Sequence, residues 1–233
     1  MALLYFLGIF VGMLIPIQTS VNSRLSQYTR SSFYASTVSF AVGTLCLIIL
    51  NLIINPHMLT PQFFTEQTFN YHWFVGGLLG VCFLTGNLLL LPRLGAALTV
   101  VITVAGQIIM GVAIDTLGLF GASQQPFTLF KAVGIVLLLI GILLMNQIPK
   151  DKLLRQSHSN LYIWLIVGFI FGCAPPIQTT INSALAKEVH SSFFASLVSF
   201  TIGTIALLIL TLIFHRSIKI NQTHPDLGHI KSI

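Results

Sequence analysis

The chain has 233 residues, of which 55% are hydrophobic and only 7% are charged. An ordinary soluble domain carries roughly 25% charged residues, so this composition excludes a typical soluble globular protein. The net charge of +6 could suggest nucleic-acid binding, but basic residues that flank membrane helices give the same total. We therefore expect the lipid bilayer, and no nucleic acid, as a partner.

A membrane-spanning helix needs about 20 mostly apolar residues. The segments that meet this requirement are residues 3–23, 33–55, 73–92, 95–114, 129–148, 161–183 and 193–214. Each is rich in Leu, Ile, Val and Phe, which does not fit the alternating strands of a membrane barrel. The sequence predicts an all-α polytopic membrane protein with about seven transmembrane helices.

Most of the basic residues fall on one side of this predicted bundle. They are Arg24, Arg30, Arg93, Lys150, Lys152, Arg155, Arg216, Lys219 and Lys231, whereas Lys131 and Lys187 fall on the other side. The positive-inside rule then puts the N-terminus outside the cell and the C-terminus in the cytoplasm. A weakly biased or dual topology is the alternative.

The first predicted helix contains the polar stretch "PIQTSVNS" at residues 16–23. Gln18 and Asn22 lie four residues apart and therefore share one face of a helix. Pro16 removes the hydrogen bond to the carbonyl of Gly12, so we expect a kink there. The freed carbonyl and the two amides could contact a polar solute in a water-filled cavity. Alternatively, the amides hydrogen-bond neighbouring helices.

This stretch returns as "PIQTTINS" at residues 176–183, and at an offset of 160 residues 8–53 align with 168–213 without a gap. The matched pairs include Gly8/Gly168, Gly12/Gly172, Pro16/Pro176, Gln18/Gln178 and Asn22/Asn182. We interpret the match as an internal duplication. Because five predicted helices precede the second copy, that copy enters the membrane from the opposite side, as in the inverted repeats of secondary transporters.

The duplication predicts a complete five-helix repeat at residues 1–150 and a partial repeat of two helices and a loop at 160–233. At the same offset Ile233 aligns with Trp73, where the third helix begins. Either the chain is a truncated form, or another chain, as in a homodimer or a complex with a partner, supplies the missing helices.

Further small and polar residues lie inside the predicted spans. Small-residue stripes in the second and seventh helices allow close helix approach: Ser36, Ser39 and Gly43, and their copies Ser196, Ser199 and Gly203. We expect these residues to pack helices, and we expect the same of Gly8, Gly12, Gly168 and Gly172. Alternatively, the serine hydroxyls face a cavity and line a path for the solute. Asn87 and Gln107 are further amides that could contact a solute.

The sequence lacks the patterns of the common enzyme sites. The acidic residues lie at predicted helix ends or in connections, so no buried carboxylate suggests a proton antiporter. The chain has no glycine-rich phosphate loop, G-x-S-x-G elbow or HExxH pair, and its three cysteines form no CxxC motif. We predict no catalytic residue, cofactor or metal.

Several longer stretches resemble the YdcZ family of the drug/metabolite transporter superfamily. They are the duplicated "PIQTSVNS…SSFYASTVSFAVGT", "GGLLG…GNLLLLPRLGAALTVVITVAGQ", "DTLGLFG" and "KAVGIVLLLIGILLM". The resemblance covers about residues 5–148 as one five-helix unit and 165–233 as the start of a second. It implies a multi-pass inner-membrane protein, either a five-helix chain that dimerises or a fused ten-helix chain, with a pathway between the halves. This sequence lacks helices eight to ten of the fused form.

The leading hypothesis is a transporter that moves a small polar or amphipathic solute, of unknown identity, by alternating access between inverted repeats. Its candidate solute contacts are Gln18, Asn22, Gln178, Asn182, Asn87 and Gln107, with helix kinks at Pro16 and Pro176. The alternative is a non-transporting membrane assembly subunit or an inactive truncated transporter fragment.

Overall fold

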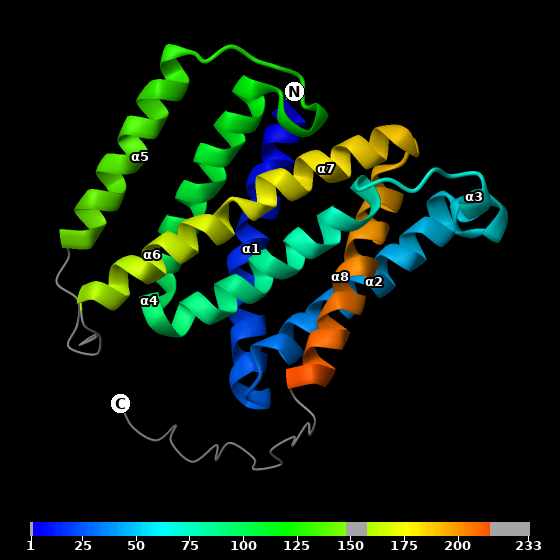
Figure 1. The fold of residues 1–233 in the computed structure, drawn as a ribbon, viewed down its shortest axis with the longest axis horizontal. Helices are drawn as coiled ribbons and strands as arrows, with labels where there is room; N and C mark the ends of the chain where they lie inside the picture. Colours follow the sequence, from blue (N-terminus) through cyan, green and yellow to red (C-terminus); the bar gives the residue numbers. More distant parts are fainter. Residues whose placement is uncertain (1, 148–157, 215–233) are drawn as a thin grey trace.

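The computed structural model describes residues 2–147 and 158–214, and all regular elements in these ranges are helical (Figure 1). The α-helices are α1 (Ala2–Thr29), α2 (Ser32–Ile54), α3 (Pro61–Thr65), α4 (His72–Leu117), α5 (Leu129–Gln147), α6 (His158–Gly172), α7 (Ala174–Glu188) and α8 (Ser192–Phe214). Two short 3₁₀ helices, η1 (Pro56–Leu59) and η2 (Leu119–Gly121), lie in the connections. The predicted all-α class is confirmed.

Five stretches are long and apolar enough to cross a membrane: Phe6–Thr29, Ser32–Ile54, His72–Leu117, Leu161–Glu188 and Ser192–Ile213. The predicted spans 73–92 and 95–114 both fall within α4. At 1.5 Å per residue, the 46 residues of α4 have a contour length of about 69 Å, which is more than twice the ~30 Å thickness of the hydrocarbon core. In α5 the apolar stretch, Leu129–Ile142, is shorter than the predicted span. Because two predicted spans form one helix in α4 and the apolar stretch of α5 is short, the structure has five candidate spans where the sequence predicted seven.

The division of α4 follows from the sequence "PRLG". Pro92 cannot donate the helical hydrogen bond, and Gly95 has φ 76° and ψ 164°, a conformation that essentially only glycine adopts. Between them, the Arg93 side chain donates to the Leu89 carbonyl at 2.6 Å and lies 4.1 Å from the ring centre of Trp164 in α6. The two halves of α4 therefore meet at a defined bend that is tied to α6.

The turn before α2 is reproduced before α8. Arg30 and His190, 160 residues apart, have φ values of 54° and 56°. The next residue in each turn caps the following helix, since Ser31 accepts from the Tyr34 amide at 3.1 Å and Ser191 from the Phe194 amide at 3.2 Å. The same short sequence, "SSF", thus starts both helices in the same way.

The two copies of the proline stretch differ in their backbones. α1 continues through Pro16, whereas α6 ends at Gly172 and α7 begins at Ala174. The second copy reads "APPIQ", so Pro175 and Pro176 both withhold an amide donor, while the first copy reads "LIPIQ". Two successive prolines end one helix and start the next.

Helices α2 and α8 pack against each other through equivalent residues. The rings of Phe40 and Phe200 stack with their centres 5.0 Å apart, and the Thr44 and Thr204 hydroxyls hydrogen-bond at 2.9 Å. Gly43 lies against the Phe200 ring, and Gly203 lies against the Phe40 ring. Each helix thus offers a glycine notch to the phenylalanine of the other, as in an isologous two-fold contact.

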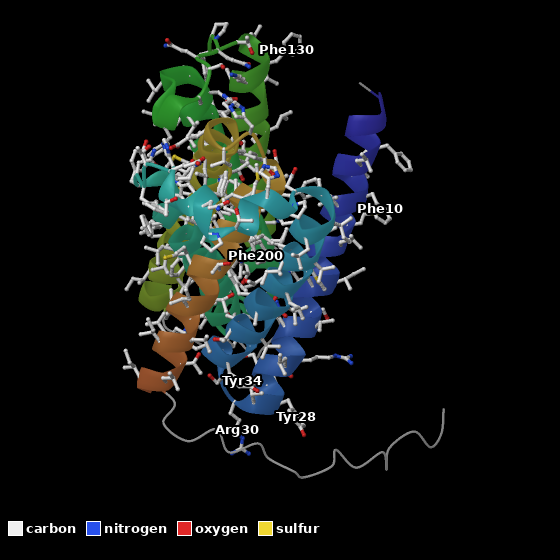
Figure 2. All side chains as sticks on the ribbon, turned by 90° about the vertical axis from the view of Figure 1, so that its right-hand side faces the viewer. Phe10, Tyr28, Arg30, Tyr34, Phe130 and Phe200 are labelled. Atoms are coloured by element: carbon white, nitrogen blue, oxygen red, sulfur yellow. The ribbon has the colours of Figure 1, made fainter. Side chains whose placement is uncertain are left out.

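The rest of the core forms around α4, which packs against α6, α7 and α8. A leucine-rich surface of α4, including Leu90, Leu94 and Ile102, contacts α6. Helix α1 packs mainly against α2, and its apolar side chains from Phe6 to Leu14 are exposed. Figure 2 shows Phe10 pointing away from the molecule at the edge formed by α1, while Phe200 lies within the bundle.

Candidate functional site

A groove of about 430 Å³ runs between the second half of α4 and α7. Its polar lining comes from Gln107 and Asp115 of α4 and from Thr179 and Thr180 of α7. The remaining lining residues are Val104, Ile108, Gly111, Ile114, Pro175 and Pro176. The groove is therefore largely apolar, with one amide, two hydroxyls and one carboxylate.

Helical periodicity places the α4 groups on one face. Gln107, Gly111 and Asp115 follow one another at intervals of four residues, so they lie along one stripe of the helix. On α7, Pro176 leads into the hydroxyl pair, and the Thr180 hydroxyl donates to the Pro176 carbonyl at 2.8 Å. The Thr179 side chain is exposed in the groove.

Asp115 lies near the end of α4, and a lysine faces it. The Lys131 Nζ of α5 is 3.9 Å from an Asp115 carboxylate oxygen, and this nitrogen is buried without a hydrogen-bond partner in the described part of the chain. The connection to α5 folds back over this end of α4, where the backbone amide of Gln125 donates to the backbone carbonyl of Asp115 at 2.8 Å. The groove thus has a charged end.

Of the six candidate amides, Gln107 lines the groove, and Gln178 and Asn182 face elsewhere. The Gln178 Nε2 donates to the Ser199 hydroxyl at 3.3 Å, and Gly80 of α4 lies against its amide. The Asn182 Oδ1 is buried against Gly76, with no hydrogen-bond partner among the described residues. The structure brings these two amides together at the contact of α7 with the first half of α4.

Gln18 and Asn22 make the equivalent contact within the first copy. Their amide nitrogens lie 3.5 Å and 3.2 Å from the Ser39 hydroxyl, so one serine accepts from both residues. Asn22 is buried, whereas Gln18 is exposed. Contact of these four amides with a solute stays a prediction.

The other candidate residues lie in or beside helix contacts. Asn87 is partly buried in the first half of α4, and Ser36 is buried and accepts from Thr85 at 3.4 Å. Ser196 donates to the Ser192 carbonyl at 2.9 Å within its own helix.

The glycines of the two copies differ in their surroundings. Gly168 lies against Ile102, and Gly172 lies against the Thr103 backbone. A side-chain carbon at Gly8 or Gly12, in contrast, would have no neighbouring atom within 4 Å. The second pair therefore lies at a close helix contact, and the first pair lies at an open face of α1.

Sequence reasoning missed four groups at the groove: Asp115, Lys131, Thr179 and Thr180. The threonines directly follow Gln178, but helical rotation turns them to another face of α7. The position of Asp115 at a helix end gives no hint of a cavity. Its four-residue spacing from Gly111 and Gln107 is the available signal that it shares their face.

A second, apolar cavity of about 350 Å³ lies between α2, α4 and α8 under the η1–α3 connection. Aromatic side chains dominate its lining, among them Phe64, Trp73 and Phe194.

In the described residues, no group of three or more His, Cys, Asp or Glu side chains comes together as a metal site would require.

Comparison with known proteins identifies one family. A family model described as "Putative inner membrane exporter, YdcZ" matches residues 3–144 and 163–230. No curated protein and no solved structure matches the chain. Since the family model covers both copies of the duplicated stretch and most of the sequence, the chain belongs to the YdcZ family that this model describes.

Proposed function

We propose that the protein exports a small polar or amphipathic solute across the inner membrane through the groove between α4 and α7. The groove is the observation that carries this proposal. Its volume of about 430 Å³ lies within the range of small-molecule sites, and its few polar groups stand in an apolar lining, as is usual for such sites. Gln107, Thr179 and Thr180 would hydrogen-bond the solute, and Asp115 would interact with it electrostatically.

Alternating access between two halves is the proposed mechanism. The reciprocal contact of α2 with α8, through Phe40 and Phe200 and through Thr44 and Thr204, supports a two-fold relation between repeats. Interruptions of regular helix flank the groove, at Gly95 where the second half of α4 begins and at Cys173 before α7. Such interruptions give the helices on both sides of the groove places to pivot.

We further propose that the ends of α1 and α2 that meet at Arg30 face the cytoplasm, which would put the N-terminus outside the cell. Arg24 and Arg30 lie at the end of α1, and Arg93 lies at the bend of α4, which agrees with one basic side. The other basic residues assigned to this side lie outside the described residues: Lys150, Lys152, Arg155, Arg216, Lys219 and Lys231.

Labelling of an Arg30→Cys chain, with its native cysteines replaced by alanine, tests this orientation. A membrane-impermeant maleimide should react only after the inner membrane has been opened. Equal labelling before and after opening would contradict the proposed orientation. The transport experiment below does not depend on the outcome.

The proposed export is tested with the full chain in proteoliposomes loaded with a mixture of amino acids, sugars and quaternary ammonium compounds. Efflux of each compound is followed by mass spectrometry and compared with protein-free liposomes. We expect faster efflux of at least one compound, and Gln107→Leu should slow it about tenfold, because losing one hydrogen bond in a buried site costs about 1.4 kcal/mol.

Gln62→Leu is the matched control, because Gln62 is an exposed glutamine in the short helix α3, away from the groove. It should export at the wild-type rate. Equal efflux from wild-type, Gln107→Leu and protein-free liposomes for every compound would contradict the proposal. Efflux that depends on the protein but not on Gln107 would retain the transport activity and reject the groove as its path.

A further inference from the structure

We infer that the groove between α4 and α7 takes a zwitterion, and that its solute is an α-amino acid with an apolar side chain. Asp115 binds the ammonium group of this solute, and Lys131 binds its carboxylate. The inference rests on the proposed function of the groove and adds the substrate class. It is supported by an ion pair with unused hydrogen-bonding groups, an open stripe of α4 beside that pair, and an apolar lining.

The ion pair has unused hydrogen-bonding groups on both sides. The Lys131 Nζ lies 3.9 Å from an Asp115 carboxylate oxygen, whereas a charge-assisted hydrogen bond measures about 2.7–2.9 Å. This ammonium group is buried and has three donors, yet it has no hydrogen-bond partner among the described residues. In the same part of the chain, no donor hydrogen-bonds the Asp115 carboxylate. Each charge can therefore take a further partner.

The two charges lie differently with respect to the groove. The Asp115 side chain is 51% exposed and lines the groove. The Lys131 side chain comes from α5 and lies behind this carboxylate, and its flexible four-carbon stem can turn the ammonium group toward a carboxylate bound there. Figure 2 shows the preceding residue, Phe130, at one end of the bundle. The pair therefore lies near the end of the helices, where charges are less costly than at the centre of a bilayer.

A zwitterion satisfies this pair without adding net charge. With a solute ammonium group at Asp115 and a solute carboxylate at Lys131, four charges of alternating sign meet, so each has two opposite neighbours. A solute with a single charge would pair with one member and leave an uncompensated charge in a largely apolar groove, which is unfavourable. The charged groups of an α-amino acid are joined through one carbon, so they can meet partners that lie only 3.9 Å apart.

The open part of the groove lies next to the pair. A side-chain carbon on Gly111 would have no neighbouring atom within 4 Å, so the stripe of α4 between Asp115 and Gln107 is open. Gly111 is four residues from Asp115, or about 6 Å along the helix. Most of the lining is apolar, including Ile108 and Pro175. An apolar side chain of the solute therefore fits over Gly111 while its charged groups meet the ion pair.

Competition for bound leucine tests the inference on the wild-type chain, without any variant. The full chain is reconstituted in nanodiscs, and binding of radiolabelled leucine is measured by scintillation proximity. Two analogues each lack one charge of leucine: 3-methylbutylamine has no carboxylate, and 4-methylpentanoate has no ammonium group. We expect each analogue to displace the label only at a concentration at least about tenfold above that of unlabelled leucine, because each loses a charge-assisted hydrogen bond.

Two variants should change this preference in opposite directions. Lys131→Met keeps an unbranched stem without the charge. It should weaken leucine binding about tenfold and bind 3-methylbutylamine more tightly than the wild-type chain does, because Asp115 then has no cationic partner. Asp115→Asn should weaken leucine binding to a similar extent and favour 4-methylpentanoate. A residue that only supported the fold would instead weaken the binding of all three ligands together.

Lys187→Met and Glu66→Gln are the matched controls. Both residues are exposed, and neither lines the groove. Each variant removes a charge of the same sign as its counterpart at the ion pair, and each should bind leucine as the wild-type chain does.

Several results would overturn the inference. They are the absence of leucine binding, displacement by either analogue at the concentration that leucine itself requires, and equal weakening of all three ligands in both variants. Efflux of a sugar or a quaternary ammonium compound that depends on Gln107, in a chain that binds no leucine, would retain the proposed export and reject the zwitterion. Charge-selective leucine binding without efflux of any compound would retain the binding site and reject export.

Discussion

Helix α1 and the pair α6–α7 carry the same glycine, proline and amide pattern, but the structure surrounds them differently. Gly172 touches the backbone of α4, whereas its copy Gly12 has open space beside it. The Gln178 amide lies against Gly80, whereas Gln18 is exposed. The pattern is therefore suited to a close helix neighbour, and the neighbour itself determines whether the pattern is buried.

The largest expected effect separates these two copies directly. Gly172→Leu should lower the free energy of unfolding by more than about 3 kcal/mol, because the added side chain meets backbone atoms that cannot rotate away. Gly12→Leu should change it by less than about 1 kcal/mol, since nothing lies beside Gly12 and leucine favours a helix. Unfolding by sodium dodecyl sulfate in mixed micelles measures both. Equal losses would show that the two copies are equally packed.

The next effect concerns α2 and α8, which meet through equivalent residues. Phe40→Ala and Phe200→Ala should each destabilise the protein by about 3 kcal/mol, because each removes a ring that fills the glycine notch of the other helix. Phe10→Ala, at an exposed position of α1, is the control and should cost far less in the same micelles. Phe40→Ala should cost the more of the two, because Phe40 is buried and also lies against Gly80 of α4. A loss confined to one of the two variants would contradict the two-fold character of this contact.

The smallest effect is expected at a hydroxyl pair of the same contact. Thr44→Val and Thr204→Val each remove the 2.9 Å hydrogen bond between these two side chains, so each should cost about 0.6 kcal/mol. The double variant should cost little more than either single one, because the bond is already lost. Additive losses in the double-mutant cycle would mean that the threonines act independently. Thr201→Val in α8 is the control, because it replaces a threonine of the same helix without removing this hydrogen bond.

Local sequence patterns predicted the features that depend on one helix at a time. Apolar segments of about 20 residues predicted the helical class, and the gap between the predicted spans 73–92 and 95–114 coincides with the break that the structure has at Gly95. The duplication also paired the residues that meet between α2 and α8, because a match at offset 160 is visible without any structure.

The surroundings of the amides could not be predicted in the same way. Whether Gln18 or Gln178 is covered depends on where α4 lies, and this depends on its bend and on contacts with three other helices. The groove arises between two helices as well, so Thr179 and Thr180 belong to it only through the rotation of α7 relative to α4. The break before α7 depends on Pro175, which aligns with Ile15 in the first copy, so the residues that match between the copies do not indicate it.

The reciprocal fit of Phe40 with Gly203 and of Phe200 with Gly43 also constrains how this sequence can diverge. Elsewhere, duplicated segments can accumulate different residues once they meet different neighbours. At this contact each copy is the neighbour of the other, so a larger residue at either notch displaces a ring that belongs to the opposite copy. A larger residue at either notch therefore has to be accommodated by the facing ring, so we expect these four positions to change together.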